Sequence, residues 1–249
     1  MEKNQNGEMM RLDLRLFELG LVRSREQAAR RIRAGAVHVN GQVVTKPSRL
    51  VSNEAILKVT EPEKYVGRGG LKLEAALDAF ETPVSGMLCL DVGASTGGFT
   101  DCLLQRGAAR VIAIDVGHGQ MVEPLRRDKR VEVYEGINAR ELVPRHFGCA
   151  FDLVVMDVSF IPLRLVLPAV VNQVKESGWL IALIKPQFEL SSEQRNRQGV
   201  VKNSKSHDQV VEAIANWFKQ QNEWDVQGVI DSPVLGGNGN KEFLICARK

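Results

Sequence analysis

Four polar residues from distant parts of the chain are of the types that could together activate a hydroxyl group. Asp157 and Lys185 each end an apolar segment, Glu242 opens another, and Lys72 lies in RGGLKLEAAL. A hydroxyl is a poor nucleophile, so an in-line displacement needs a positioned base or a cation that stabilises the developing alkoxide. Each residue alone has an ordinary interpretation, as a solvated lysine, a strand-end aspartate or a turn glutamate. Burial disfavours a charged lysine, so convergence of all four would indicate chemistry.

The apolar segment of residues 87–93 runs into a glycine-rich turn, and the stretch that contains this turn begins Asp91-Val-Gly93. Glycine at a strand-to-helix turn lets the backbone approach a ligand, and the next helix N-terminus favours polar or anionic groups. The spacing Gly-x-Ser-x-Gly-Gly departs from the dinucleotide fingerprint G-x-G-x-x-G. Asp115 ends the next apolar segment, where a carboxylate can accept both hydroxyls of a ribose. We predict a ribose-containing ligand here, and a tight turn without a ligand is the alternative.

Near-continuous apolar segments predict the strands that position these residues, because such runs are typical of parallel strands buried on both faces. The last two apolar segments are too close together for a crossover helix, so we expect them to form an antiparallel hairpin. The predicted fold class is α/β, a Rossmann-like sheet of five parallel strands with an antiparallel edge hairpin. The strands are expected at residues 87–93, 109–117, 131–136, 151–159, 179–187, 226–232 and 242–248, and helices at 99–105, 163–174 and 207–221.

Ligands bind outside the carboxyl ends of the strands in open α/β sheets. Asp157 and Lys185 lie at that edge, and Glu242 joins them because the antiparallel last strand begins there. Lys72 begins a helix ahead of the first strand, from which its amine can reach the same edge. We therefore expect one site to contain all four residues.

The N-terminal part of the chain is more basic than the remainder, which predicts two domains, residues 1–62 and 63–249. Residues 1–66 hold 12 Lys or Arg and 8 Asp or Glu, whereas the whole chain holds 33 and 30. The stretch TEPEKYVGRGG (60–70) combines proline, glycine and charge and predicts the connection between the domains.

Two helices and a small sheet are predicted in the first domain. Leu12, Leu16 and Leu19 recur at helical spacing, and Gly20 ends that helix. Ser24 and Gln27 form a capping-box pattern at the start of the second helix. Ala28, Ala29 and Ile32 are expected to face inward and the arginines outward, before Gly35 ends the helix. Strands follow at residues 37–39, 43–44 and 56–59, the first two joined by the hairpin turn Asn40-Gly41.

The outward-facing arginines of this domain could neutralise phosphates and recognise folded RNA by its shape. A solvated basic helix is the alternative. The predicted RNA-binding residues are Arg11, Arg23, Arg25, Arg30 and Arg33.

The segment DVGASTGGFTD and Asp115 resemble the class I S-adenosylmethionine-dependent methyltransferases, over residues from about 67 to 249. The resemblance implies S-adenosylmethionine as cofactor, with its methionine portion at Asp91 and the glycine-rich turn and its ribose at Asp115. It places Asn138 near the adenine, unless this is an ordinary turn asparagine, and Asp157 near the methyl group. The implied cofactor-binding set is Asp91, Gly93, Ala94, Ser95, Thr96, Gly97, Gly98, Phe99, Asp115, Asn138 and Asp157.

The order Lys72, Asp157, Lys185, Glu242 matches the Lys-Asp-Lys-Glu tetrad of the FtsJ-like RNA ribose 2′-O-methyltransferases. The resemblance implies that Lys185 activates the hydroxyl and that the other three orient and tune it. Two rival chemistries lack their motifs. No cysteine follows a proline, as carbon-5 methylation of pyrimidines requires, and Asp157-Val-Ser-Phe160 is not the Asp/Asn-Pro-Pro-aromatic turn of adenine amino methylation.

The basic helix and hairpin of residues 10–60 resemble the RNA-binding module named after small-subunit ribosomal protein S-four. With GRGGLKL, MDVSFI, LIKPQFE and GNKEF, the chain is similar to the TlyA, or haemolysin A, family of rRNA methyltransferases. This resemblance implies methyl transfer to a ribose 2′-hydroxyl of ribosomal RNA, on a cytidine, with ribosomal RNA or an assembled ribosomal subunit as partner. A non-catalytic RNA-binding protein that keeps the cofactor pocket is one alternative, and a haemolysin is another.

The composition also indicates in which cellular compartment the protein works. Four scattered cysteines without metal-ligand spacing predict no metal site and a reducing compartment. The longest apolar stretches are far shorter than the roughly 20 residues of a membrane span. The first residues, MEKNQNGEMMRL, lack the apolar region of a secretory signal. We therefore expect a cytoplasmic protein with no membrane partner.

Overall fold

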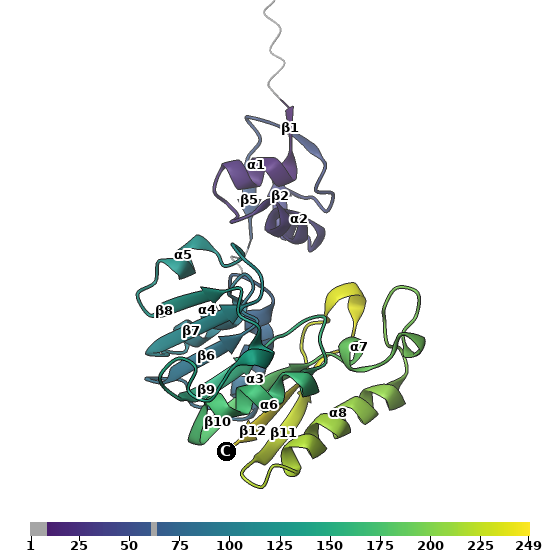
Figure 1. Cartoon of the computed structure of the whole chain (residues 1–249). Coiled ribbons are helices and arrows are strands. Elements are labelled where there is room, and N and C mark those ends of the chain that lie inside the picture. The colour runs from purple at the N-terminus through teal and green to yellow at the C-terminus, as the bar shows by residue number, and fades with distance from the viewer. Residues whose placement is uncertain (1–8, 61–63) are drawn as a thin grey trace, which may run out of the picture. The chain divides into compact units, whose positions relative to one another are not determined.

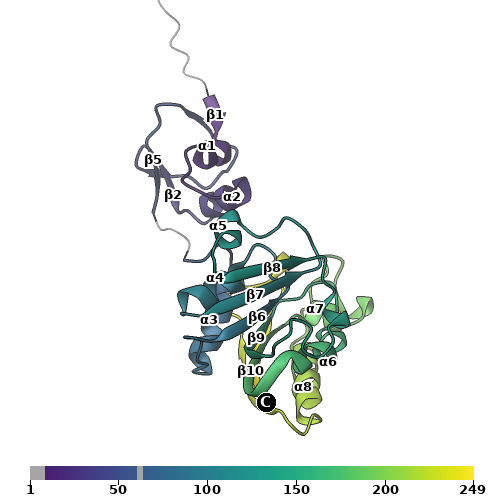
Figure 2. The ribbon, with the colours of Figure 1, turned by 60° about the vertical axis from the view of Figure 1, so that its left-hand side comes forward.

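The computed structural model describes residues 9–60 and 64–249, which form two compact units (Figures 1 and 2). Met1–Glu63 make the N-terminal unit and Lys64–Lys249 the C-terminal unit. The domain boundary predicted between residues 62 and 63 lies outside the described residues. Each of the two units has its own hydrophobic core.

The N-terminal unit packs two helices, α1 (Leu12–Glu18) and α2 (Arg25–Arg33), against short strands. Leu12, Leu16 and Ile32 are fully buried in its core. The hairpin turn predicted at Asn40-Gly41 is present, with both residues at positive φ. The turn joins β2 (Val37–Val39) to β3 (Gln42–Val43), and β5 (Leu57–Val59) pairs with the other side of β2. A second small sheet, which was not predicted, pairs β1 (Met9–Arg11) with β4 (Leu50–Ser52).

The second helix begins as its sequence predicts but exposes fewer arginines than expected. The Ser24 hydroxyl accepts a hydrogen bond of 3.1 Å from the backbone N–H of Gln27, so Ser24 is the N-cap. The Gln27 side chain accepts from the backbone N–H of Arg23. The prediction that all arginines face solvent is wrong for Arg31, which is buried. Arg31 lies one helical turn from Gln27 and Ala28, both buried, and therefore at the flank of the core-facing stripe.

The C-terminal unit is built on a seven-stranded sheet, and its α/β class is as predicted. The strand order is β11-β12-β10-β9-β6-β7-β8. Strand β12 is antiparallel to both of its neighbours, β10 and β11, and all other pairs in this sheet are parallel. The predicted antiparallel hairpin of β11 and β12 is therefore confirmed, with the reversed strand second from the edge. The strands are β6 (Leu88–Val92), β7 (Arg110–Asp115), β8 (Val131–Glu135), β9 (Phe151–Met156), β10 (Val174–Ile184), β11 (Asp225–Asp231) and β12 (Phe243–Arg248).

Helices cover both faces of this sheet, as Figures 1 and 2 show. One core contains side chains of α3 (Gly69–Ala79) and α4 (Gly98–Gln105), and the other contains side chains of α6 (Leu167–Val170) and α8 (Ser204–Lys219). Two short helices, α5 (Glu123–Arg126) and α7 (Pro186–Glu189), follow β7 and β10.

The helix predicted at residues 163–174 is wrong as a single helix. It divides into a 3-10 turn at Leu163–Leu165, α6, and a second 3-10 turn at Val171–Gln173. Pro168 supplies no N–H for a bond to the preceding turn, so it is tolerated in the first turn of α6 but not in the middle of a longer helix. Strand β10 also starts at Val174, five residues before the predicted start, and has an irregular register up to Trp179.

Within residues 9–60 and 64–249, no helix is long and apolar enough to cross a membrane. The described residues also contain no cluster of three or more His, Cys, Asp or Glu side chains suited to a metal ion, and all four cysteines are free thiols.

Candidate active site

The four predicted catalytic residues form two ion pairs at the carboxyl edge of the sheet. Lys185 follows the last residue of β10, and its Nζ lies 2.5 Å from Oδ1 of Asp157, which follows β9. Lys72 on α3 donates a hydrogen bond of 2.6 Å from Nζ to Oε2 of Glu242, which precedes β12. The topology therefore brings together residues that are up to 170 positions apart.

Contacts between neighbouring elements join the two pairs into one cluster. Gln187, two residues after Lys185, donates from Nε2 to Oε1 of Glu242 at 3.1 Å. Gly69 begins α3, one turn before Lys72, and a Cβ there would lie 3.9 Å from Oδ2 of Asp157.

Three members of the cluster are shielded from water, with Lys72 7%, Lys185 9% and Glu242 2% exposed, and Asp157 is partly exposed. Two lysines and two carboxylates balance in charge, which makes their burial tolerable only as a set.

Two residues that sequence reasoning missed complete the cluster. The Nζ of Lys185 donates a hydrogen bond of 2.7 Å to the hydroxyl of Ser159. Gln187 is buried, and its Oε1 has no hydrogen-bond partner among the described residues. Both stand two positions beyond a predicted strand-end residue, and that spacing is the signal that could have identified them.

Glycines at the turn after β6 permit close backbone contacts that any side chain would block. Gly93 has φ +85°, and a Cβ there would lie 2.5 Å from the carbonyl oxygen of Asp157. Gly97, at φ +98°, would place a Cβ against the side chain of Leu125. The turn therefore lies directly against the end of β9, with the catalytic candidate Asp157 beside it.

A pocket of about 720 Å³ opens at this edge. Five of the predicted cofactor-binding residues line it, namely Gly93, Ser95, Asp115, Asn138 and Asp157, whereas Asp91, Ala94, Thr96, Gly97, Gly98 and Phe99 do not. Much of the remaining lining was not predicted, because it is apolar and lies in loops that follow the strands. It includes Val116, Ile137, Val158, Phe160, Ile161, Pro162, Leu165 and Val166.

Asp91 lies behind the pocket and is fully buried. Its Oδ2 accepts a hydrogen bond of 2.6 Å from the Thr100 hydroxyl, and its Oδ1 has no hydrogen-bond partner among the described residues. Burial raises the pKa of Asp91 to about 7, with the Thr100 hydrogen bond opposing this and the charges of Asp157 and Asp115 adding to it. Such a carboxyl fits a cationic ligand group, which would stabilise its ionised form.

Asp115 and Asn138 both line the pocket, but their side chains make different hydrogen bonds within the protein. The Asp115 carboxylate accepts from the backbone N–H of Ser95 at 2.8 Å and of Gly117 at 2.7 Å, which fixes its orientation. The Asn138 side chain accepts from the backbone N–H of Arg140 and donates to Glu141, and so caps a short 3-10 turn. The turn interpretation of Asn138 therefore holds for its side chain.

An exposed aromatic residue, Phe160, forms part of the pocket rim. It is 90% exposed and has φ +63°, a left-handed backbone conformation that is strained for a side chain of this size. Its ring centroid lies 5.1 Å from that of Phe188, whose ring in turn lies 5.8 Å from the Nζ of Lys185. Neither aromatic residue was predicted as functional.

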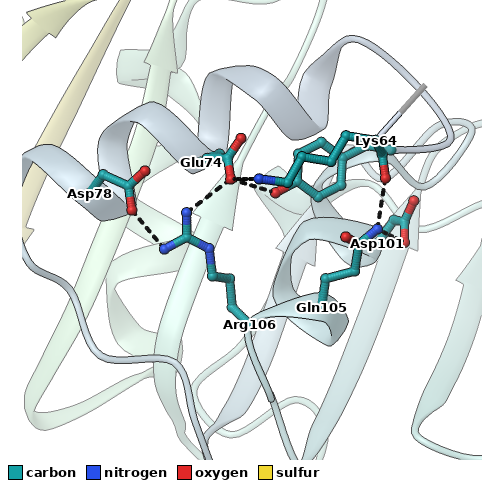
Figure 3. A network of polar contacts seen from close by, with 7 residues as sticks. Lys64, Glu74, Asp78, Asp101, Gln105 and Arg106 are labelled. Carbon is teal, nitrogen blue, oxygen red and sulfur yellow. Dashed lines mark hydrogen bonds and ion pairs between the residues drawn. The ribbon is translucent and has the colours of Figure 1, made fainter. Parts of the chain in front are cut away.

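A polar network holds α3, and with it Lys72, against α4 (Figure 3). Glu74 accepts hydrogen bonds from Lys64, Tyr65 and Arg106, and Arg106 also pairs with Asp78 at 2.6 Å. Burial alone would raise the pKa of Glu74, but the three donors outweigh it and the pKa is lowered. The network therefore favours an ionised Glu74 at neutral pH.

In the N-terminal unit the predicted RNA-binding residues differ in their exposure and in their ion pairs. Arg11 pairs with the buried carboxylate of Asp13 at 2.8 Å, and Arg25 lies 3.9 Å from the same carboxylate. Arg23, Arg25 and Arg33 are exposed, whereas Arg30 is half-buried. A hydrogen bond from Arg11 is the main cause that lowers the pKa of Asp13, so this pair is charged at neutral pH.

Comparisons with known proteins agree with this architecture. Residues 65–249 match the FtsJ-like methyltransferase family, and residues 10–57 match the S4 domain family. The chain is 46% identical to the 16S/23S rRNA (cytidine-2′-O)-methyltransferase TlyA of Mycobacterium tuberculosis, over 96% of this chain and 89% of that protein. It is 37% identical to Hemolysin A of Brachyspira hyodysenteriae, over 94% and 98%. A solved structure described as "Putative hemolysin from Streptococcus thermophilus" shares 42% identity and a TM-score of 0.76, over 97% and 88% of the two chains.

Proposed function

Because this chain belongs to the FtsJ-like methyltransferase family, and within it to the TlyA group, we propose that it methylates a ribose 2′-hydroxyl of ribosomal RNA. The methyl donor in this proposal is S-adenosylmethionine and the acceptor nucleotide is a cytidine, as in the name of the mycobacterial relative. A ribosomal substrate would place the protein in the cytoplasm.

One observation carries the proposal: a buried lysine, Lys185, is held by Asp157 and Ser159 at the edge of the pocket. Its two partners fix the amine in one place, whereas a free lysine side chain samples many rotamers. Asp157 and Ser159 both line the pocket, and Lys185, which does not line it, is in direct contact with both of them. Positioning of this kind is what a hydroxyl nucleophile requires for an in-line displacement.

The residues divide the chemistry between them. S-adenosylmethionine, when bound, supplies a methyl group carried on a sulfonium. Lys185 either accepts the proton of the ribose 2′-hydroxyl or stabilises the developing alkoxide with its charge, and Asp157 and Ser159 orient its Nζ. Glu242 accepts a hydrogen bond from Gln187, two residues after Lys185, and pairs with Lys72, so Lys72 and Glu242 preserve the shape and charge balance of the site.

The residues present fit the proposed cofactor. Gly93 lines the pocket, and Asp115 offers a fixed carboxylate to the hydroxyls of a ribose. The unpaired Oδ1 of Asp91 suits the ammonium of a methionine portion. In this proposal Asp91, Gly93, Ser95, Asp115 and Asp157 hold the cofactor, and Ala94, Thr96, Gly97, Gly98, Phe99 and Asn138 shape the turns around it.

The N-terminal unit, whose residues 10–57 match the S4 domain family, supplies RNA binding in this proposal. Its exposed arginines Arg23, Arg25 and Arg33 would contact phosphates, with Arg11 and Arg30 supporting them. The exposed Phe160 on the rim of the pocket offers a face on which a nucleobase can stack, which favours a nucleic acid over a protein substrate.

A transfer assay tests this function directly. The protein is incubated with isotopically labelled S-adenosylmethionine and with each purified ribosomal subunit or with protein-free ribosomal RNA, and the labelled nucleotide is mapped. A 2′-O-methyl group blocks alkaline cleavage at its own nucleotide, so label in an alkali-resistant cytidine dinucleotide supports the proposal. Label on a base, or none on either subunit or on protein-free ribosomal RNA, would refute it. A liposome-leakage assay with the same preparation tests the activity named for the Brachyspira relative, which no observed feature of the described residues favours.

A further inference from the structure

A basic segment lies beside the candidate active site in the C-terminal unit. Residues 190–205 follow α7, extend into the first turn of α8, and carry four cations against a single carboxylate, Glu193. The cations are Arg195, Arg197, Lys202 and Lys205. Residues 126–130 are also strongly basic, but Arg126, Arg127 and Arg130 there pair with carboxylates.

Specific hydrogen bonds anchor this segment to the loop that carries Glu242. The backbone N–H of Val201 donates to Oδ1 of Asn240 at 3.1 Å, and the Asn240 amide donates to the carbonyl oxygen of Gly199 at 3.3 Å. Asn240 is buried and stands two residues before Glu242. In Figure 1 the two loops lie side by side next to α7.

A further hydrogen bond connects this segment to Gln187, which is bonded to Glu242. Arg195 donates from its guanidinium to the carbonyl oxygen of Gln187 at 3.0 Å, and the side chain of Gln187 holds Glu242. The basic segment is therefore held at Arg195 by the backbone of Gln187, and at Gly199 and Val201 by the side chain of Asn240.

The charges on this segment are available for a partner. Arg197, Lys202 and Lys205 are exposed and make no side-chain hydrogen bond or ion pair with any residue in the described part of the chain. Many other cations of the unit are neutralised by carboxylates. These include Arg106, Arg110, Arg126, Arg127, Arg130, Arg164, Lys175, Lys241 and Lys249.

We propose that residues 195–205 form a second RNA-binding surface, which contacts the phosphate backbone next to the nucleotide that is methylated. This proposal rests on the proposed function, because it takes RNA as the substrate. A ribose 2′-hydroxyl is adjacent to the 3′-phosphate of its own nucleotide, so phosphates necessarily enter the site together with the acceptor. Lysine and arginine contacts to phosphates fix the register of an RNA strand without reading its bases.

Two pairs of substitutions that remove the same charge test this surface. The test variant carries Arg197→Gln and Lys202→Gln. The control carries Lys129→Gln and Lys219→Gln, two exposed lysines near the starts of β8 and β11, at the opposite edge of the sheet. Binding of the full-length proteins to protein-free ribosomal RNA is measured at several salt concentrations, with thermal unfolding and cofactor affinity as checks on folding.

We expect the test variant to bind RNA roughly tenfold or more weakly at 0.1 M salt, and its salt dependence to flatten by about 1.5 in log–log slope. The control should match the wild-type protein. Equal affinity and slope in the two variants would overturn the proposal. A defect seen only with assembled subunits would also overturn it and would indicate an acidic protein partner. Because binding is measured without turnover, a wild-type protein that binds RNA but transfers no methyl group would refute the proposed function and leave this test readable.

Discussion

Lys72 donates a hydrogen bond of 2.6 Å to Glu242 across 170 residues of sequence, and both side chains are buried. The pair ties α3, ahead of the first strand of the sheet, to β12, the last strand in the chain. Strand β12 pairs with β10, the strand that Lys185 follows, so the Lys72–Glu242 pair joins the helix ahead of the sheet to this part of the sheet. The pair therefore links the start and the end of the C-terminal unit at the site.

Removing one member of this pair should be costly to stability. Glu242→Ala leaves the Lys72 amine buried without its carboxylate, and we expect a loss of about 3–5 kcal/mol in the free energy of unfolding. Glu242→Gln keeps an acceptor for Lys72 and should cost less. Urea denaturation measures both. A double variant that carries Lys72→Met and Glu242→Gln should lose less free energy of unfolding than the single variants Lys72→Met and Glu242→Gln lose in sum. Additive losses would show that the pair is not coupled.

Asp91 should connect cofactor binding to pH. Its pKa of about 7 lies above that of an unfolded aspartate, so the folded state keeps a proton that the unfolded state has lost. The stability contribution of Asp91 is therefore full below about pH 4 and is lost as pH rises toward 7. Asp91→Asn removes the titrating carboxyl group and with it this loss. The free energy of unfolding of the variant, relative to that of the wild-type protein, should therefore rise by a few kcal/mol between pH 4 and pH 7.

The same substitution should weaken cofactor binding, because an amide cannot pair with an ammonium as a carboxylate does. Calorimetry with S-adenosylmethionine at pH 6 and pH 8 measures this, and wild-type affinity should be higher at pH 8. The exposed Asp208→Asn is the matched control. Unchanged affinity in a folded Asp91→Asn protein would exclude the assigned role.

The N-terminal unit should carry most of the RNA affinity. The C-terminal unit has its own sheet and its own cores, so deletion of residues 1–60 should leave it folded and able to bind cofactor. Binding to ribosomal RNA should weaken strongly, and its salt dependence should flatten because the truncated protein neutralises fewer phosphates. Filter binding at several salt concentrations checks this. Equally tight RNA binding by the truncated protein would assign another role to the unit.

Much of the C-terminal unit could be predicted from the sequence because its strands are buried on both faces. Near-continuous apolar runs marked β6, β7, β9 and β10, and the polar residues that end them marked the sheet edge. Asp157 and Lys185 were found for that reason. The match to the FtsJ-like family confirms the resemblance that named the tetrad.

Features that depend on tertiary contacts could not be predicted from the sequence. The short strands β1 and β4 pair only with each other, and neither has a periodic pattern long enough to recognise. Arg31 is buried by the packing of its helix, which a single-helix pattern does not describe. Ser159 and Gln187 acquire their roles only when β9, β10 and β12 lie side by side, and the exposure of Phe160 depends on a strained turn.

The most direct test of the proposed mechanism is single-turnover methylation by Lys185→Ala, measured alongside binding of cofactor and RNA. Asp157, the partner left behind, is partly exposed, so the variant should stay folded and should bind both ligands as the wild-type protein does. We expect methyl transfer to fall on the order of 10²-fold or more, as for removal of a positioned acid–base group. Lys185→Arg should not restore it, because a guanidinium keeps its proton and its fork is larger than an ammonium. Methylation near the wild-type rate by Lys185→Ala would contradict the mechanism.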